Sequence, residues 1–263
     1  MKKYLFIVYL AVITPIIMAG CSSFFNNEDD IAPVYSGKLE KEQLAEPSGN
    51  YKCLRIPGII ITPNNTILVY YESRYSWQDY AKIDIIEYRS TDFGTTLTKQ
   101  ILAKGTDAYP TVNNPIMIAC KNHEVLFFYS ENYTVADGNL KMRKSYDDGL
   151  SWQDSVTITD YASPESHDAF ALVPGHGILS SSGVLIIPCW YVQKGTGETT
   201  TAHEPSVISV FYSLDTGNSW TLADTLKYNT DVTNPSECSI VECSDHRFYD
   251  NIRNYKSGYR AIA

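Results

Sequence analysis

Hydrophobic residues occur along most of the chain in short runs separated by polar residues and turn formers, and no long stretch repeats with the period of an α-helix. Such runs occupy residues 59–62, 67–71, 83–89, 140–144 and 207–212. Short runs bounded by Gly, Pro, Asn and Asp are typical of β-strands joined by turns. The 20 Tyr and 15 Gly residues fit the same class, because Tyr favours strands and Gly favours turns. We therefore predict an all-β protein.

Three segments share an eight-residue pattern, S-x-D-x-G-x-S/T-W, and each directly follows a predicted strand. They are residues 90–97 (STDFGTTL), 145–152 (SYDDGLSW) and 213–220 (SLDTGNSW), with Leu97 in place of Trp in the first. The Asp can accept hydrogen bonds from the backbone N–H groups of a tight turn, and the Gly supplies a positive φ. The closing aromatic side chain can pack the hairpin onto its sheet. Each segment therefore predicts a β-hairpin with a structural role.

The spacing of these segments sets the size of the repeating unit. Their first residues, 90, 145 and 213, span two intervals (213 − 90 = 123), or roughly 60 residues per unit, somewhat more than the blade of a common β-propeller. Each unit has room for four short strands, which is the strand content of a propeller blade. After residue 49 there are 214 residues left (263 − 49 = 214), so we expect about four units.

The N-terminus has the pattern of an export signal. Residues 1–3 carry two lysines, residues 4–18 are apolar, and small residues precede Cys21. This order predicts a secretion signal, and the apolar run is short for a membrane-spanning helix of about 20 residues. Residues 17–21 (IMAGC) resemble a bacterial lipobox, in which the cysteine is lipidated and becomes the new N-terminus. An ordinary signal peptide or a single membrane anchor is the alternative.

We accordingly divide the chain into a lipoprotein signal peptide at residues 1–21, a flexible tether at residues 22–49 and a folded domain at residues 50–263. The tether is expected because its sequence is polar and rich in charged residues. Ser22 rather than Asp follows the lipobox cysteine, which favours the outer membrane. The expected location is that of an exported lipoprotein on the outer membrane or the cell surface, or on the periplasmic face.

Composition excludes several classes of function. The net charge is −9 and no run of Lys and Arg occurs, so we expect no nucleic-acid partner. Of six cysteines, those other than Cys21 are odd in number and lack C-x-x-C spacing, which predicts buried thiols rather than a disulfide frame or a zinc site. Cys238 and Cys243 could pair only if the strand geometry brought them together. The sequence has no metal-ligand cluster, phosphate loop or nucleotide motif, so no metal or cofactor is expected.

Residues 51–58 (YKCLRIPG) resemble the Arg-Ile-Pro motif near the start of bacterial sialidase domains, with Leu54 where an aromatic residue is usual. The three eight-residue segments resemble the Asp boxes, or BNR repeats, of the same family. The resemblance covers roughly residues 51–263 and implies a six-bladed sialidase-type β-propeller. Six blades at this spacing need roughly 360 residues, so the chain is expected to be truncated at its C-terminus to about four blades.

The resemblance also implies a set of site residues. Arg55 would belong to the arginine triad that grips the carboxylate of sialic acid, since a guanidinium is a planar and permanently charged partner for a carboxylate. Arg74 would also bind substrate, and Asp79 follows Arg74 at the offset that separates an arginine from the acid/base aspartate in sialidases. Asp84 is the rival carboxylate, but it stands inside a predicted strand. The apolar Trp77 near Asp79 would favour the protonated acid.

A second pair of implied site residues lies near the end of the chain. Sialidases place a Glu on one strand and an Arg on the next, which here implies Glu237 as the carboxylate that activates the nucleophile and Arg253 as the second triad arginine. Glu242 is the rival of Glu237, but it lacks the Asn-rich context before Glu237. Residues 174–177 resemble the Pro-Gly-x-Gly segment of the family, where we expect His176 to shape the site rather than to catalyse.

The implied activity is that of an exo-α-sialidase, which releases terminal sialic acid from glycoconjugates with retention of configuration. A neutral Tyr nucleophile, deprotonated by Glu237, suits a sugar whose anomeric carbon bears a carboxylate that would repel an anion. Asp79 would protonate the leaving sugar. The resemblance places the third arginine and the Tyr beyond Ala263, so the 263 residues alone are expected to have little or no sialidase activity.

The expected partners are sialylated glycans or glycoproteins and, through the lipid, a membrane. Two other functions remain open on the sequence. The same arginines would suit a glycosidase for another 2-keto sugar acid, and Asp boxes alone would suit a non-catalytic glycan-binding propeller on the cell surface. Activity on sialic acid, activity on another keto acid, or binding alone would separate the three functions.

Overall fold

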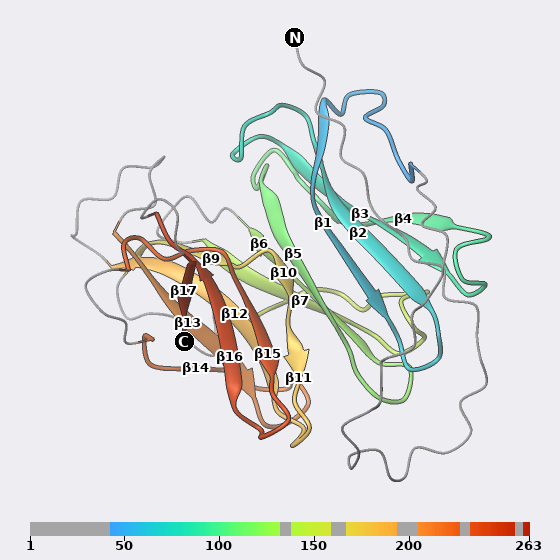
Figure 1. The fold of residues 1–263 in the computed structure, drawn as a ribbon. Helices are drawn as coiled ribbons and strands as arrows, with labels where there is room; N and C mark the ends of the chain where they lie inside the picture. Colours follow the sequence, from blue (N-terminus) through green and yellow to red (C-terminus); the bar gives the residue numbers. More distant parts are fainter. Residues whose placement is uncertain (1–42, 132–137, 159–166, 194–204, 227–231, 256–259) are drawn as a thin grey trace, which may run out of the picture. The chain divides into compact units, whose positions relative to one another are not determined.

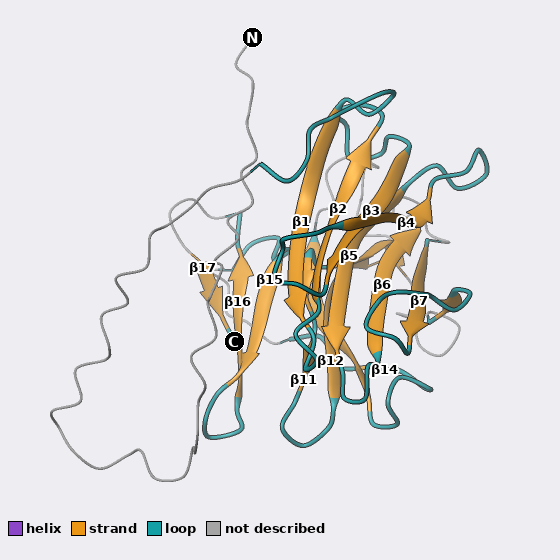
Figure 2. Ribbon diagram, turned by 90° about the vertical axis from the view of Figure 1, so that its right-hand side faces the viewer, coloured by secondary structure: helices purple, strands orange, loops and turns teal. Residues whose placement is uncertain are grey.

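The computed structural model describes residues 43–131, 138–158, 167–193, 205–226, 232–255 and 260–263 (Figure 1). Residues Pro47–Ala263 form one compact unit. All regular secondary structure within the described residues is β (Figure 2). The same residues hold no helix long and apolar enough to cross a membrane. The predicted signal peptide and most of the predicted tether lie outside the described residues.

The first two sheets follow the chain order and bring neighbouring strands together as antiparallel pairs. The first sheet consists of β1 (Cys53–Ile61), β2 (Ile67–Arg74), β3 (Ile83–Ser90) and β4 (Thr98–Lys104), in that order. The second sheet consists of β5 (Val112–Ala119), β6 (Val125–Glu131), β7 (Asn139–Ser145) and β8 (Val156–Thr157), and β10 (Gly175–His176) joins β5 in parallel. Four short strands per unit were predicted; the first sheet has four, and the second has four consecutive strands plus β10.

The remaining strands form two more sheets. The third sheet consists of β11 (Ile178–Leu179), β12 (Leu185–Gln193), β13 (Ser206–Ser213) and β14 (Thr221–Leu222), with β9 (His167–Leu172) also paired to β12. The fourth sheet consists of β15 (Cys238–Glu242), β16 (Phe248–Arg253) and β17 (Arg260–Ile262). The all-β class and the four successive sheets are thus confirmed, while the six-bladed ring and its truncation stay predictions.

The Asp boxes form three turns with the same hydrogen bonds. In each box the Asp Oδ1 accepts a hydrogen bond of 2.8 Å from the preceding Ser Oγ and another of 2.8 Å from the backbone N–H four residues later; the Asp residues are Asp92, Asp147 and Asp215. The closing Trp152 and Trp220 meet Phe127 and Phe128 edge-on at 5.8 and 5.3 Å between ring centroids. The predicted turns and the packing of the two tryptophans are confirmed.

A second structural repeat occurs in one hairpin turn of each sheet. These turns join β1 to β2, β5 to β6, β11 to β12 and β15 to β16, at residues 62–66, 120–124, 180–184 and 243–247. In every one the first residue donates its N–H to the carbonyl oxygen of the fifth, at 2.7 to 2.9 Å. The fourth residue has a left-handed φ, and these residues are Asn65 (63°), His123 (65°), Gly183 (89°) and His246 (63°). Asn, Gly and His are residues that tolerate this conformation better than most. The four sheets therefore share one hairpin geometry although the hairpin sequences differ.

The hydrophobic core lies between successive sheets. Alternate residues of β6 face opposite ways, so that Phe127 packs with Leu68 and Tyr70 of the first sheet, whereas Phe128 packs with Phe211 of the third. Between the third and fourth sheets, buried residues of β12 and β13 pack with Ile252 of β16. Successive sheets thus share a core: the first with the second, the second with the third, and the third with the fourth.

The cysteines were predicted to be buried thiols, and this is correct for four of the five described ones. Cys53, Cys120, Cys189 and Cys238 are buried and free. Cys243 is also free, but it is exposed, because it begins the hairpin turn after β15. Cys238 and Cys243 lie at opposite ends of that strand, about 16 Å apart at 3.3 Å per residue, and therefore cannot form a disulfide.

Candidate functional site

Arg55 stands at an irregularity in β1. The pairing of β1 with β2 shifts register between Arg55 and Gly58, which marks a β-bulge. Within the bulge Ile56 adopts a φ of 53° directly before Pro57. A left-handed conformation is unusual for a β-branched residue, and local strain of this kind is often retained at functional sites. The bulge interrupts the regular alternation of side chains between the two faces of β1, and it begins at Arg55.

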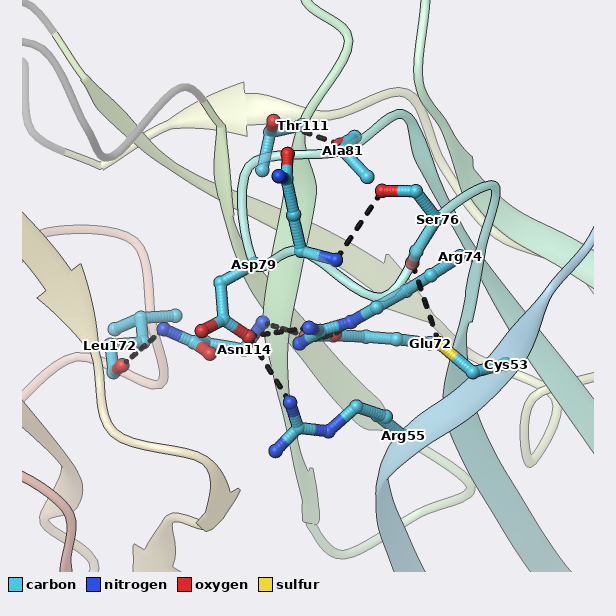
Figure 3. Close-up of polar contacts among 11 residues, drawn as sticks. Cys53, Arg55, Glu72, Arg74, Ser76, Asp79, Ala81, Thr111, Asn114 and Leu172 are labelled. Carbon is cyan, nitrogen blue, oxygen red and sulfur yellow. Dashed lines mark hydrogen bonds and ion pairs between the residues drawn. The ribbon is translucent and has the colours of Figure 1, made fainter. Parts of the chain in front are cut away.

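Arg74, the last residue of β2, is almost wholly buried and lies between two carboxylates (Figure 3). Its Nε and Nη2 contact Oε2 of Glu72 at 2.7 and 2.5 Å, and its Nη1 contacts Oδ1 of Asp79 at 2.5 Å. The Arg74 side chain is 2% exposed. Burial by itself would lower the pKa of Arg74, but the carboxylates of Glu72 and Asp79 raise it above its ordinary value. Arg74 therefore stays charged inside the fold.

Glu72 has no exposure to solvent, accepts two hydrogen bonds and makes an additional ion-pair contact with Arg74. Besides the two nitrogens of Arg74 on Oε2, the backbone N–H of Asn114 donates to Oε1 at 2.7 Å. Burial raises the pKa of Glu72, and the contacts with Arg74 and Asn114 oppose that rise. Protein donors rather than water therefore stabilise this carboxylate. Because Asn114 belongs to β5, Glu72 also connects the first sheet to the second.

Asp79 lies in the loop after β2, and its side chain is 55% exposed. Its Oδ1 contacts both Arg74 and Nη1 of Arg55, the latter at 3.4 Å. The structure therefore brings together the predicted residues Arg55, Arg74 and Asp79 (Figure 3). Trp77, which was expected to provide apolar surroundings for Asp79, is itself 63% exposed.

The rival carboxylate Asp84 has a different environment. It is 1% exposed and accepts hydrogen bonds from the Tyr51 hydroxyl at 2.7 Å and from the Gly105 N–H at 3.0 Å. Its oxygens are therefore used in holding β3 to neighbouring segments. Of the two candidate carboxylates, Asp79 is the one that a ligand in solvent could contact.

Glu237 and Arg253 form a second pair on the fourth sheet. Arg253 Nη1 lies 2.9 Å from Glu237 Oε2, and the side chains are 46% and 48% exposed. The backbone N–H of Arg253 donates to the Glu237 carbonyl at 2.7 Å, so the two residues stand directly opposite each other. The guanidinium also lies over the ring of Tyr255, at 5.6 Å from its centroid. Both groups are accessible and already oriented toward each other.

Glu242, the rival of Glu237, lies at the other end of β15. Its carboxylate accepts hydrogen bonds from the N–H and Oγ of Ser181 at 2.6 and 2.5 Å, and His246 lies 3.2 Å away. These contacts join hairpin turns of the third and fourth sheets. Glu242 is thus a structural link at the far end of the strand from Arg253.

A residue with positive φ precedes a proline near both pairs. These residues are Ile56 (53°) in β1 and Asn234 (46°) in the segment before β15, and Asn114 (53°) in β5 has the same feature. The site residues Arg55 and Glu237 lie within three residues of such a position. Among the described residues, no hydrogen bond or ion pair joins Arg55 or Asp79 directly to Glu237 or Arg253.

Two residues of the site were missed by the sequence reasoning. Glu72 contacts the predicted residue Arg74, and Asn114 contacts Glu72, but neither stands in a recognised sequence motif. The available signal was a charged residue two positions before Arg74 inside a buried strand, and an Asn-Pro step that parallels Ile56-Pro57.

The remaining predicted residues lie elsewhere. His176 is exposed in β10 and pairs along the backbone with Met117, so its shaping role stays a prediction. The adjacent Gly175 carbonyl accepts a hydrogen bond of 2.8 Å from the buried Tyr70 hydroxyl. Cys21, the predicted lipidation site, lies outside the described residues.

Comparison with known proteins identifies the family. The family model described as BNR repeat-like domain matches residues 56–248. The chain is 27% identical over 232 residues to a sialidase of Clostridium perfringens, covering 81% of this chain and 58% of that protein. It is 25% identical over 244 residues to a sialidase of Bacteroides fragilis (strain YCH46), covering 81% of this chain and 42% of that protein.

The fold is also similar to that of solved sialidase structures. The structure of Hadza microbial sialidase Hz136 matches with a TM-score of 0.69 at 21% identity, over 81% of this chain and 44% of that one. The chain thus spans about half the length of these relatives. The matched segment begins at Ile56 of the Arg-Ile-Pro motif and includes all three Asp boxes. The chain therefore belongs to the BNR repeat-like family, and its predicted relationship to the bacterial sialidases is confirmed.

Proposed function

We propose that the site around Arg55, Asp79, Glu237 and Arg253 belongs to an exo-α-sialidase that releases terminal sialic acid with retention of configuration. The proposal rests on the pairing of two accessible arginines with accessible carboxylates: Arg55 pairs with Asp79, and Arg253 pairs with Glu237. This gives cations for a sugar carboxylate and two groups for proton transfer. Similarity to sialidases over four fifths of the chain supports the substrate class.

In the proposed reaction the arginines act on the carboxylate of the sugar. Arg55 and Arg253 would exchange their present partners for that carboxylate, because a guanidinium can form two parallel hydrogen bonds with it. Asp79, released from Arg55, would then carry the proton that the leaving glycosidic oxygen takes up. Glu237 would accept the proton of the nucleophile. Neither the third arginine nor the nucleophile is assigned to a residue of this chain.

The test is binding of N-acetylneuraminic acid to the purified 263-residue chain, measured by ligand-observed NMR and calorimetry. We expect binding without appreciable hydrolysis of a fluorogenic sialoside. Arg55→Ala should weaken binding by about tenfold or more, because it removes a charge-assisted contact with the ligand carboxylate. Arg247→Ala is the matched control, since Arg247 is an exposed arginine paired with Asp245 at the opposite end of β16.

The comparison of ligands separates this function from its competitors. N-acetylmannosamine lacks the carboxylate and should not compete for the site. Tighter binding of a different 2-keto sugar acid would favour the related glycosidase, and equal binding by the Arg55→Ala and wild-type chains would exclude the proposed role of Arg55. Absence of binding by every sugar acid would contradict the proposal for this chain.

A further inference from the structure

We propose that Glu72 is a positioning residue, which fixes the guanidinium of Arg74 against Asp79 and fastens this pair to the second sheet. The catalytic meaning of Asp79 rests on the proposed function, whereas the contacts of Glu72 do not. Glu72 lies 18 residues before the nearest Asp box (90 − 72 = 18) and outside the Arg-Ile-Pro motif. Its role follows from the geometry of its two hydrogen bonds and its ion pair with Arg74.

Glu72 fixes the orientation of the Arg74 guanidinium. A guanidinium presents its N–H groups in a rigid plane, so contacts at two of its nitrogens fix the third. Glu72 Oε2 accepts a hydrogen bond from Nε of Arg74 at 2.7 Å and makes an ion-pair contact with Nη2 at 2.5 Å. Nη1 is then directed at Asp79 (Figure 3). The exposed Asp79 carboxylate is therefore placed by an arginine that is itself held from behind.

The donors around position 72 match a carboxylate side chain. All three partners of this side chain are donors: two nitrogens of Arg74 and the backbone N–H of Asn114. An ionised carboxylate offers acceptors only, whereas an amide would turn its NH2 group toward one of these donors. Glutamine at this position would keep the size of the side chain and lose the match. The arrangement therefore requires a carboxylate rather than any polar group.

Asn114 connects Glu72 to the second sheet. Asn114 has a φ of 53° and lies where the pairing of β5 with β6 shifts register, so its N–H is not part of the strand ladder. Glu72 accepts this N–H, and the Asn114 Nδ2 donates to the Leu172 carbonyl of β9 at 3.0 Å. Contacts thus run from Asp79 through Arg74, Glu72 and Asn114 into the third sheet. This path explains how a side chain on a loop can hold a fixed position.

The experiment begins with the wild-type chain, by NMR. We expect a resolved Arg74 Nε–H signal that exchanges slowly with water, and an Asn114 amide proton that is protected despite its irregular backbone. In Glu72→Gln the Arg74 signal should broaden or disappear, and the Asn114 amide should exchange about tenfold faster or more, because its acceptor is lost. Amide protons of β6 should keep their wild-type exchange rates.

Glu87→Gln is the matched control, since Glu87 is also a fully buried glutamate of the first sheet but does not contact Arg74. It should leave the Arg74 and Asn114 signals unchanged. Arg74→Lys keeps the charge without the fork, and it serves as the second variant if Glu72→Gln does not fold. In Arg74→Lys the exchange rate of the Asn114 amide should stay within about threefold of wild type, because Glu72 remains its acceptor.

Binding of N-acetylneuraminic acid completes the test. If the wild-type chain binds this ligand, Glu72→Gln should weaken binding about tenfold while Glu87→Gln does not. Unprotected Arg74 and Asn114 protons in the wild-type chain would overturn the positioning role, whatever the ligand does. Normal NMR signals together with no sugar binding would support the positioning role and contradict only the proposed function.

Discussion

Two buried glutamates of the first sheet, Glu72 and Glu87, receive different hydrogen bonds on their carboxyl groups. Glu72 meets a guanidinium and a backbone N–H, whereas Glu87 receives the Gln100 amide on Oε1, at 2.9 Å. The other oxygen of Glu87 has no hydrogen-bond partner among the described residues. Burial accordingly raises the pKa of Glu87 from its ordinary 4.5 to about 7. Burial raises the pKa of both carboxyl groups, and nearby arginines oppose that rise in each case.

The raised pKa of Glu87 predicts a specific pH dependence of stability. Between about pH 4.5 and pH 7 the unfolded chain loses the Glu87 proton while the folded chain retains it, so the free energy of unfolding falls as pH rises through this window. The loss from this group is at most about 3 kcal/mol. Glu87→Gln stays neutral, and urea unfolding at pH 5 and pH 7.5 should show a smaller fall for this variant than for the wild type. An equal fall in both chains would contradict the assignment.

At the scale of single residues, the sequence indicated the site wherever a local motif existed. Arg55 stands in an Arg-Ile-Pro motif, and Asp79 follows Arg74 at a recognisable offset, so the contact among them could be expected. Glu72 and Asn114 could not be found in this way, because their role depends on a contact between strands 42 residues apart in the chain. The exposure of Trp77 was equally invisible, since the path of a loop is not set by its composition.

At the scale of elements, the three Asp boxes have the same internal hydrogen bonds but different surroundings. The second box packs against the first sheet: Arg89 Nε donates to the Asp148 carbonyl and Gln100 Nε2 to the Gly149 carbonyl, both at 2.8 Å. A Cβ on Gly149, whose φ is 80°, would lie 2.9 Å from the side chain of Leu68. The first box ends instead in Leu97, which is 39% exposed. The second box therefore also serves as a contact between sheets.

This difference predicts unequal effects of the same substitution. Asp147→Ala should lower the free energy of unfolding by about 2 kcal/mol, because it removes the acceptor that holds the turn and loosens its contacts with the first sheet. Asp92→Ala removes the same internal bonds in a more exposed turn, so the loss should be smaller. Urea unfolding of the two variants under one condition makes the comparison. Equal losses would show that the second box does not stabilise the contact between sheets.

The sequence predicted elements better where chemistry repeats than where only geometry repeats. The boxes were found because Ser, Asp and Gly are needed at fixed positions of that turn. The four equivalent hairpins at residues 62–66, 120–124, 180–184 and 243–247 were not found, because their shared feature is a backbone conformation that Asn, His and Gly can all adopt. The same hairpin explains the one wrong cysteine prediction, since Cys243 opens such a turn and is exposed.

At the scale of the whole Pro47–Ala263 unit, the sheets follow the chain and each core is shared by neighbours. Among the described residues, the core between the second and third sheets contains 16 buried residues, whereas that between the third and fourth contains 8. The fourth sheet also carries exposed apolar side chains on its other face, namely Val241 (51% exposed), Tyr249 (39%) and Ile262 (64%). Stability in an array of this kind is close to a sum over neighbouring contacts. The fourth sheet should therefore be the least stable part of the described β structure.

Hydrogen exchange followed by mass spectrometry measures this gradient directly. Amide protons of β16 should exchange about tenfold faster or more than those of β6, because a smaller core opposes local opening. Ile252 is 1% exposed in the core between the third and fourth sheets, so Ile252→Ala should speed exchange across β15 to β17 while β6 stays at its wild-type rate. Ile262→Ala is the control, since Ile262 is 64% exposed and contributes little to that core. If Ile252→Ala instead accelerates exchange equally in β6 and β16, the sheets unfold as one cooperative unit, and the additive description of their stability is wrong.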